Sequence, residues 1–186
     1  AQGYLDGNPL YERLPTYYGP IYYFDKWFLH SVLSLPLTHD VTRAICVLHW
    51  LLAASILAVA GWRMSRSPLV GFFVFGLTVR HLIHLAMEPG HPQELAALLL
   101  PTAILVAAGG FERKSTPALL GVICAALVFT KINLGGFFGF ALMLAVCSQA
   151  PLFQSQRLAY WIILGLSSLV PWLLMRHHLS VPWGRE

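Results

Sequence analysis

The sequence predicts an all-α protein, a polytopic bundle of transmembrane helices with an extracytoplasmic N-terminal loop and an interfacial helix. Of the 186 residues, 57% are hydrophobic and only 11% are charged, whereas a soluble domain carries roughly 25% charged residues. Several apolar runs also approach the ~20 residues that a helix needs to cross a bilayer. We divide the chain into the loop with its interfacial helix (1–40) and a transmembrane bundle of about six spans (41–186).

The first part of the chain is nearly the only long segment that could not lie in lipid. Residues 1–19 are polar and punctuated by prolines and a Gly-Pro pair, which is typical of turns. Residues 21–35 are apolar and aromatic but carry Asp25, Lys26 and His30. This mixture favours a helix that lies at the membrane interface over one that crosses the membrane.

Beyond residue 40, apolar runs alternate with short polar loops. The expected spans are 41–62, 69–87, 94–108, 117–133, 134–150 and 158–175. The fourth and fifth meet in the turn 131–136, around Lys131.

The three cysteines, Cys46, Cys124 and Cys147, fall inside apolar runs. Their spacing is not that of a zinc site or a disulfide framework, and we interpret them as buried small side chains.

Positive residues predict the orientation of the bundle. They occur in alternate loops, at Arg63, Arg66, Arg113, Lys114 and Arg157. The positive-inside rule places these loops in the cytoplasm. The head loop, the 88–93 loop, the 131–136 turn and the 177–186 tail then share the extracytoplasmic side. No basic run with interleaved aromatic residues occurs, so we expect no nucleic-acid partner.

A cationic pocket is predicted at that outer side. Arg80, His84 and Glu88 have the spacing i, i+4, i+8 and would share one helix face. Ionisable groups at membrane depth are costly and therefore functional candidates, although an Arg80–Glu88 bridge between helices would also explain them. Together with His91 and Lys131, the cations Arg80 and His84 would bind a phosphate carried on a lipid. Alternatively, Lys131 snorkels to the headgroups.

Tyrosines concentrate in the head loop. Tyr11, Tyr17 and Tyr18 would stack on a sugar or anchor the loop at the interface. We assign them, with Glu88, to the substrate loop.

Histidine and carboxylate side chains are also common zinc ligands. The possible ligands here do not have the spacing of a zinc signature, so no metal site is predicted. These possible ligands are His81, His84, Glu88 and His91.

Three short motifs carry a family resemblance. Gly7-Asn8-Pro9-Leu10-Tyr11 followed by Tyr18-Gly19-Pro20 and an aromatic run resembles the first extracytoplasmic loop of bacterial integral-membrane glycosyltransferases. These enzymes belong to the GT-C superfamily, relatives of the dolichyl-phosphate-mannose protein mannosyltransferases. Arg43, which opens the next span, is similar to the family pattern. Thr130-Lys131 with the following Gly135 is likewise similar to the close of a later family span.

The resemblance implies an enzyme of the hexosyltransferase class. Such an enzyme moves a sugar from a polyprenyl-phosphate donor to an extracytoplasmic acceptor, in the bacterial inner membrane. An acid in the first outer loop is the general base, a role that the resemblance places on Asp6, although Asp6 would also suit a turn before Gly7. Cationic groups stabilise the leaving phosphate. The expected partners are the lipid-linked donor and membrane lipids. No organic cofactor is expected, and a divalent cation is left open.

Family members carry a span before this loop and more spans after it, so the chain is expected to be a fragment. Two rival hypotheses stay open. The first is a non-enzymatic membrane protein that binds or transports a lipid-linked anionic substrate. The second is a metal or haem protein, with His49 and His84 facing each other from two spans.

Overall fold

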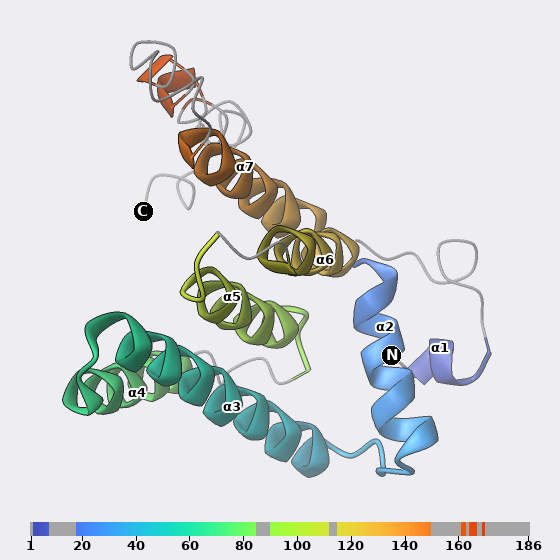
Figure 1. Ribbon diagram of the computed structural model, residues 1–186. Helices are drawn as coiled ribbons and strands as arrows, with labels where there is room; N and C mark the ends of the chain where they lie inside the picture. Colours follow the sequence, from blue (N-terminus) through green and yellow to red (C-terminus); the bar gives the residue numbers. More distant parts are fainter. Residues whose placement is uncertain are drawn as a thin grey trace, which may run out of the picture. The chain divides into compact units, whose positions relative to one another are not determined.

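The computed structural model describes residues 2–7, 18–84, 90–111 and 115–149, with a few residues between 161 and 169. Every element in these ranges is helical, which confirms the all-α prediction (Figure 1). The helices are α1 (Gln2–Leu5), α2 (Pro20–Trp27), the π-helix η1 (Phe28–Val32), α3 (His39–Ser65), α4 (Pro68–Ile83), α5 (Gln93–Ala107), α6 (Ser115–Thr130) and α7 (Ile132–Gln149). The chain divides into two compact units, 1–136 and 137–186. The functional division predicted at residue 40 stays a prediction.

Helix α3 has well-defined signals at both ends. Thr38 precedes it, and its Oγ1 accepts a hydrogen bond from the Val41 N–H at 3.3 Å, as an N-cap should. Arg66 ends it in the left-handed conformation (φ 56°) and donates its N–H to the Trp62 carbonyl. Helix α3 has 27 residues and includes an 18-residue stretch with a mean hydropathy of 2.2, which makes it the one helix in the described ranges that is long and apolar enough to cross a membrane.

The other predicted spans are helical but shorter. Helix α5 has 15 residues and α4 and α6 have 16 each, which gives them a length of about 22–24 Å. The second predicted span, 69–87, is helical as far as Ile83 and His84 lies in a turn, while its last residues, 85–87, lie outside the described residues. Pro89 and Gly90 follow closely in the sequence, and both disfavour a longer helix. The sixth predicted span, 158–175, lies largely outside the described residues.

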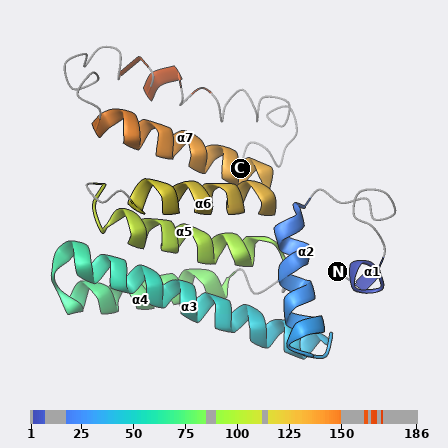
Figure 2. The same ribbon diagram turned by 45° about the vertical axis from the view of Figure 1, so that its right-hand side comes forward.

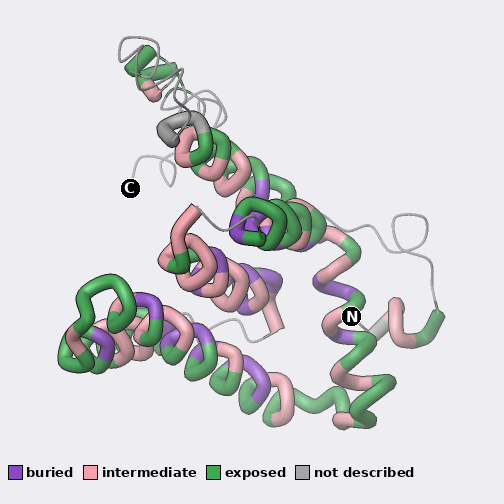
Figure 3. The backbone as a smooth tube through the Cα atoms, in the orientation of Figure 1, coloured by how far each residue is buried: buried purple, intermediate pink, exposed green. Residues whose placement is uncertain are grey.

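Within the first unit, α3 packs against α4 and α5, and α5 packs against α6. Figure 2 shows α3, α5 and α6 stacked in layers, with α2 standing across one end of the stack. The core where α3, α4 and α5 meet contains Cys46, Trp50, Ala53 and Leu82, with Ala97 and Leu98 against them. Buried residues form narrow stripes on these helices, and much of the remaining surface is exposed (Figure 3).

The predicted junction of two short helices near Lys131 is confirmed, but the turn is shorter than expected. The Lys131 N–H still bonds the Leu127 carbonyl at 2.8 Å, and the Gly135 N–H already bonds the Lys131 carbonyl at 3.1 Å. The helix therefore resumes at Ile132, and 132–136 is not a loop. A side chain at Gly135 would overlap the backbone nitrogen of Val128, so glycine permits the close approach.

Candidate functional site

The head segment docks onto one end of the bundle through its backbone. The Gly19 N–H donates to the Thr130 carbonyl at the end of α6, at 3.0 Å. A Cβ atom at Gly19 would overlap the Phe129 carbonyl oxygen, so only glycine fits here. Pro20 then opens α2 at a position where its missing N–H costs nothing. The start of α2 is thus fixed against the end of α6, one residue before Lys131.

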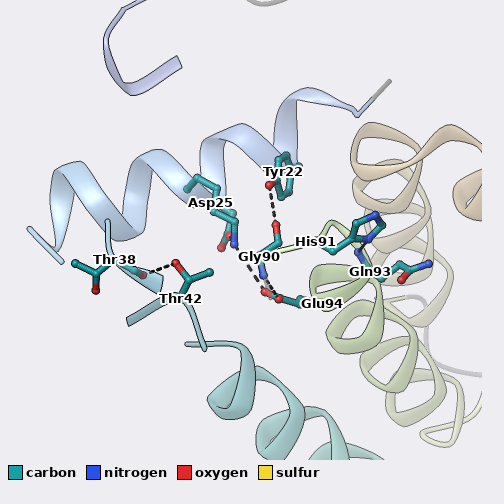
Figure 4. Close-up of polar contacts among 9 residues, drawn as sticks. Tyr22, Asp25, Thr38, Thr42, Gly90, His91, Gln93 and Glu94 are labelled. Atoms are coloured by element: carbon teal, nitrogen blue, oxygen red, sulfur yellow. Dashed lines mark hydrogen bonds and ion pairs between the residues drawn. The ribbon is translucent and has the colours of Figure 1, made fainter. Parts of the chain in front are cut away.

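A second attachment joins α2 to the turn before α5. The Tyr22 hydroxyl donates to the Gly90 carbonyl at 2.7 Å (Figure 4). The Gly90 N–H in turn donates to the Glu94 carboxylate. Gly90 has φ +83°, a conformation that favours glycine, and a Cβ atom there would lie 3.0 Å from Cγ2 of Thr42 on α3. Residues from α2, α3 and α5 therefore converge on Gly90.

Beside this attachment lies a buried charge cluster, formed by Asp25, Lys26 and Glu94. Lys26 and Glu94 are each only 5% exposed. The Lys26 Nζ atom is 3.2 Å from Asp25 Oδ2 and 3.8 Å from Glu94 Oε2. One ammonium thus faces two carboxylates, which leaves one surplus negative charge if all three groups are ionised. Neither of these two carboxylate oxygens accepts a hydrogen bond in the described part of the chain, so the cluster is costly to bury.

Aromatic rings pack against one another next to the contact between Tyr22 and Gly90. Edge-on ring pairs link Tyr4 to Tyr23, Tyr23 to Tyr22 and Tyr22 to Tyr18, with centroids 5.0–5.5 Å apart. Burial, assisted by the nearby Tyr23 and Glu94, raises the pKa of Tyr22 to about 12. The Tyr22 phenol therefore keeps its proton at neutral pH and remains the donor to Gly90.

Tyr18 and His91, both predicted as site residues, meet at this end of the bundle. The Tyr18 hydroxyl lies 3.2 Å from His91 Nε2, and their rings are edge-on at 5.5 Å. The Gln93 backbone N–H donates to His91 Nδ1 at 3.3 Å. In the neutral ring the proton then lies on Nε2, so His91 donates to the Tyr18 oxygen.

These contacts test the predicted gathering of segments. The described parts of the head loop, the 88–93 loop and the start of the 131–136 turn do lie together, through Tyr18–His91, Tyr22–Gly90 and Gly19–Thr130. Lys131 is half-buried at this end. That part of the prediction is confirmed, whereas the side of a membrane that this end faces stays a prediction.

The remaining predicted site residues are more scattered. Arg80 and His84 are exposed at the end of α4, and Asp6 is exposed in the turn after α1. Helix α4 ends at Ile83, with His84 in the turn that follows, and the helix face expected to join Arg80 and His84 to Glu88 stays a prediction. Glu88, Tyr11 and Tyr17 lie outside the described residues. A pocket formed by Arg80, His84, His91 and Lys131 stays a prediction.

The metal and haem alternatives gain no geometric support. His49 is half-buried on α3, while His81 and His84 are exposed. Across the described ranges, no group of three or more His, Cys, Asp or Glu side chains is arranged to hold a metal ion.

Sequence reasoning missed the buried charge cluster. Its signal was a charged pair, Asp25-Lys26, inside an aromatic run, and an acid, Glu94, in the first turn of an apolar helix. The arrangement fixes the turn that carries His91, while Tyr18, His91 and Lys131 supply N–H and O–H donors suited to an anion.

No protein-family model, curated protein or solved structure matches this chain.

Proposed function

We propose that this chain is part of a polytopic membrane glycosyltransferase, which moves a sugar from a polyprenyl-phosphate-linked donor to an extracytoplasmic acceptor. The observation that carries the proposal is the contact of Tyr18 with His91 at 3.2 Å, at the bundle end where the head segment docks. The Tyr18 ring can stack on a sugar, and a phosphate that displaces the Tyr18 oxygen from His91 can accept the imidazole N–H in its place.

The exposed surface supports placement in a membrane. Large apolar side chains on the outer faces of the helices are strongly exposed, including Phe72 at 78%, Leu69 at 77% and Val122 at 66%. A soluble monomer rarely exposes extended apolar patches, whereas lipid covers them at no cost. Helices of about 22–24 Å are short for a hydrocarbon core of about 30 Å, and local thinning of the bilayer accommodates such a mismatch.

The proposed chemistry uses the donors at the docking end. Asp6, as the resemblance implies, takes the proton of the acceptor hydroxyl. The acceptor oxygen bonds to the anomeric carbon as the bond between that carbon and the phosphate oxygen breaks. His91 and Lys131, with Arg80 and His84, stabilise the departing lipid phosphate. Tyr4 packs edge-on against Tyr23, which holds α1, and Asp6 just after it, alongside α2.

Transfer from a labelled donor tests this proposal. The full-length protein is reconstituted in nanodiscs with a polyprenyl-phosphate hexose and an acceptor, and the transferred label is counted. Lys131→Ala and Arg80→Ala should each lower the transfer rate by about 10²-fold or more, the loss typical for one donor to a developing charge. Arg63→Ala, at the other end of the bundle, is the matched control and should retain the wild-type rate.

Two results would overturn the proposal. The first is a wild-type rate in both the Lys131 and the Arg80 variant, which removes the cationic site. The second is wild-type protein that binds the donor but transfers nothing to any acceptor, which favours the non-enzymatic alternative.

A further inference from the structure

An apolar groove runs between α3 and α4, at the end of these helices that lies away from α2. Its volume is about 340 Å³, within the range of small-molecule sites. The residues that line it have the spacing i, i+3, i+4, i+7 on each helix and so form one stripe on each. They are Ser55, Ala58, Val59 and Trp62 from α3, and Pro68, Gly71, Phe72 and Phe75 from α4. Two helical turns make the groove about 10 Å long.

The two helices approach closely along this groove. A Cβ atom at Gly71 would lie 3.0 Å from the Ala58 carbonyl oxygen and 3.1 Å from Cβ of Trp62. The larger side chains stand at the rim, where Trp62 is 53% and Phe72 is 78% exposed. An apolar furrow with exposed aromatic rims suits a hydrocarbon chain, because its burial removes apolar surface from water.

Two arginines lie where the groove meets the α3–α4 turn. Arg63 directly follows Trp62, and Arg66 lies two residues before Pro68; both are exposed. Neither forms an ion pair with another residue in the described ranges. The sequence from 41 to 87 contains no Asp or Glu, and the one carboxylate of the two helices, Asp40, lies in the first turn of α3, at the opposite end from these arginines.

We propose that this groove binds an anionic phospholipid, with one acyl chain along the α3–α4 furrow and its headgroup phosphate paired with Arg63 and Arg66. A zwitterionic lipid could enter the furrow equally well, but its headgroup carries no net charge for the arginines. Charge complementarity therefore selects the anionic lipid. The inference rests on the membrane placement proposed above and is independent of sugar transfer.

Fluorescence quenching by brominated acyl chains tests the site, because Trp62 lines the groove. The protein is placed in phosphatidylcholine nanodiscs that contain increasing fractions of brominated phosphatidylglycerol or, separately, brominated phosphatidylcholine. The contribution of Trp62 is the difference between wild type and Trp62→Phe. Half-maximal quenching of Trp62 should need about 30-fold less brominated phosphatidylglycerol, because each of the two arginines near the membrane surface contributes about 1 kcal/mol.

Matched variants separate the headgroup from the furrow. The double variant Arg63→Gln/Arg66→Gln should lose the preference for phosphatidylglycerol, while Arg43→Gln, an exposed arginine near the other end of α3, should keep it. Ala58→Phe, which fills the furrow, should reduce the quenching of Trp62 by both lipids. Equal quenching by the two lipids in wild type, or a preference that survives the double variant, would overturn the proposal.

Two further measurements distinguish a lipid phosphate from a free phosphate, and lipid binding from the proposed sugar transfer. Inorganic phosphate at millimolar concentration should leave the preference for phosphatidylglycerol unchanged. If added phosphate abolishes this preference, the arginines bind a free anion and the proposed lipid site is overturned. The double arginine variant should transfer sugar at the wild-type rate. If wild-type protein transfers no sugar but shows the lipid preference, the function proposed above fails while the lipid site stands.

Discussion

The two ends of α3 use charge in opposite ways. At its start, Thr42 contacts the Gly90 turn, next to a cluster in which Lys26 and Glu94 are almost fully buried. At its end, Arg63 and Arg66 are exposed beside an apolar groove. Charges at the first end hold parts of the protein together, whereas charges at the second end are available to a molecule outside it.

This difference distinguishes charged residues that stabilise the fold from charged residues that could bind a ligand. Burying three charged groups is expensive unless their mutual attraction and other hydrogen bonds compensate. The compensation here comes from elements that meet at one place, since α2 contributes Tyr22 and Lys26 and the α5 turn contributes Gly90 and Glu94. Charged residues within apolar segments are therefore not sufficient evidence of a substrate site, because Lys26 and Glu94 instead hold α2 against α5.

Glu94→Ala tests the buried charges at the start of α3 and should have the largest effect on stability. It leaves the half-buried Gly90 N–H without its acceptor and removes one of the two carboxylates that face Lys26. We expect a loss of about 2–4 kcal/mol in the free energy of unfolding, measured by denaturant titration in detergent micelles. Glu94→Gln keeps an acceptor and removes the surplus negative charge, so its cost should be less than half as large.

Gln93→Ala is the matched control for Glu94. The Gln93 side chain is exposed and only its backbone N–H bonds His91, so its change should stay within about 0.5 kcal/mol. If Glu94→Ala is as mild as this control, the buried charge cluster does not stabilise the docking end and the contrast between the two ends of α3 fails.

An intermediate effect is expected from Tyr22→Phe. The Gly90 carbonyl loses its donor, at a cost of about 1–2 kcal/mol. Folding raises the pKa of Tyr22 from 10.0 to about 12, mainly through burial. The resulting stability is complete below pH 10 and is lost as the pH rises toward 12. Wild type should therefore lose more thermal stability than Tyr22→Phe between pH 10 and 12.

Tyr4→Phe provides the control, because the Tyr4 ring packs against Tyr23 and its hydroxyl bonds no described residue. Its melting temperature should follow that of wild type over the same pH interval. A Tyr22→Phe melting curve that also follows wild type would mean that Tyr22 does not titrate at the docking end.

Composition and spacing predicted most of the fold. Apolar runs located the long helices to within a few residues, and Lys131 with its following glycines located the break between α6 and α7. Helix ends were less predictable, since α4 stops at Ile83 although the apolar pattern continues to Met87. Apolarity reports whether a residue tolerates lipid, while helix termination depends on turn residues further along the chain.

The site was predictable only in part. Tyr18 and His91 were identified, because aromatic and ionisable residues near an outer loop are unusual. The buried charge cluster was missed, since Asp25 and Lys26 were interpreted only as part of an interfacial helix and Glu94 only as the start of an apolar span. Pairing between α2 and α5 joins residues nearly seventy positions apart, and local pattern carries no information about such contacts.

The smallest effect, with the opposite sign, is expected at the other end of α3. Arg66 ends the helix at φ 56°, a conformation that costs a residue with a side chain more than it costs glycine. Arg66→Gly should raise the free energy of unfolding in lipid-free detergent by about 0.5–1 kcal/mol. Arg63→Gly, inside the helix, is the control and should destabilise by a similar amount. If Arg66→Gly destabilises as well, then the arginine side chain makes contacts that hold the turn, and the charges at this end are structural like those at the other.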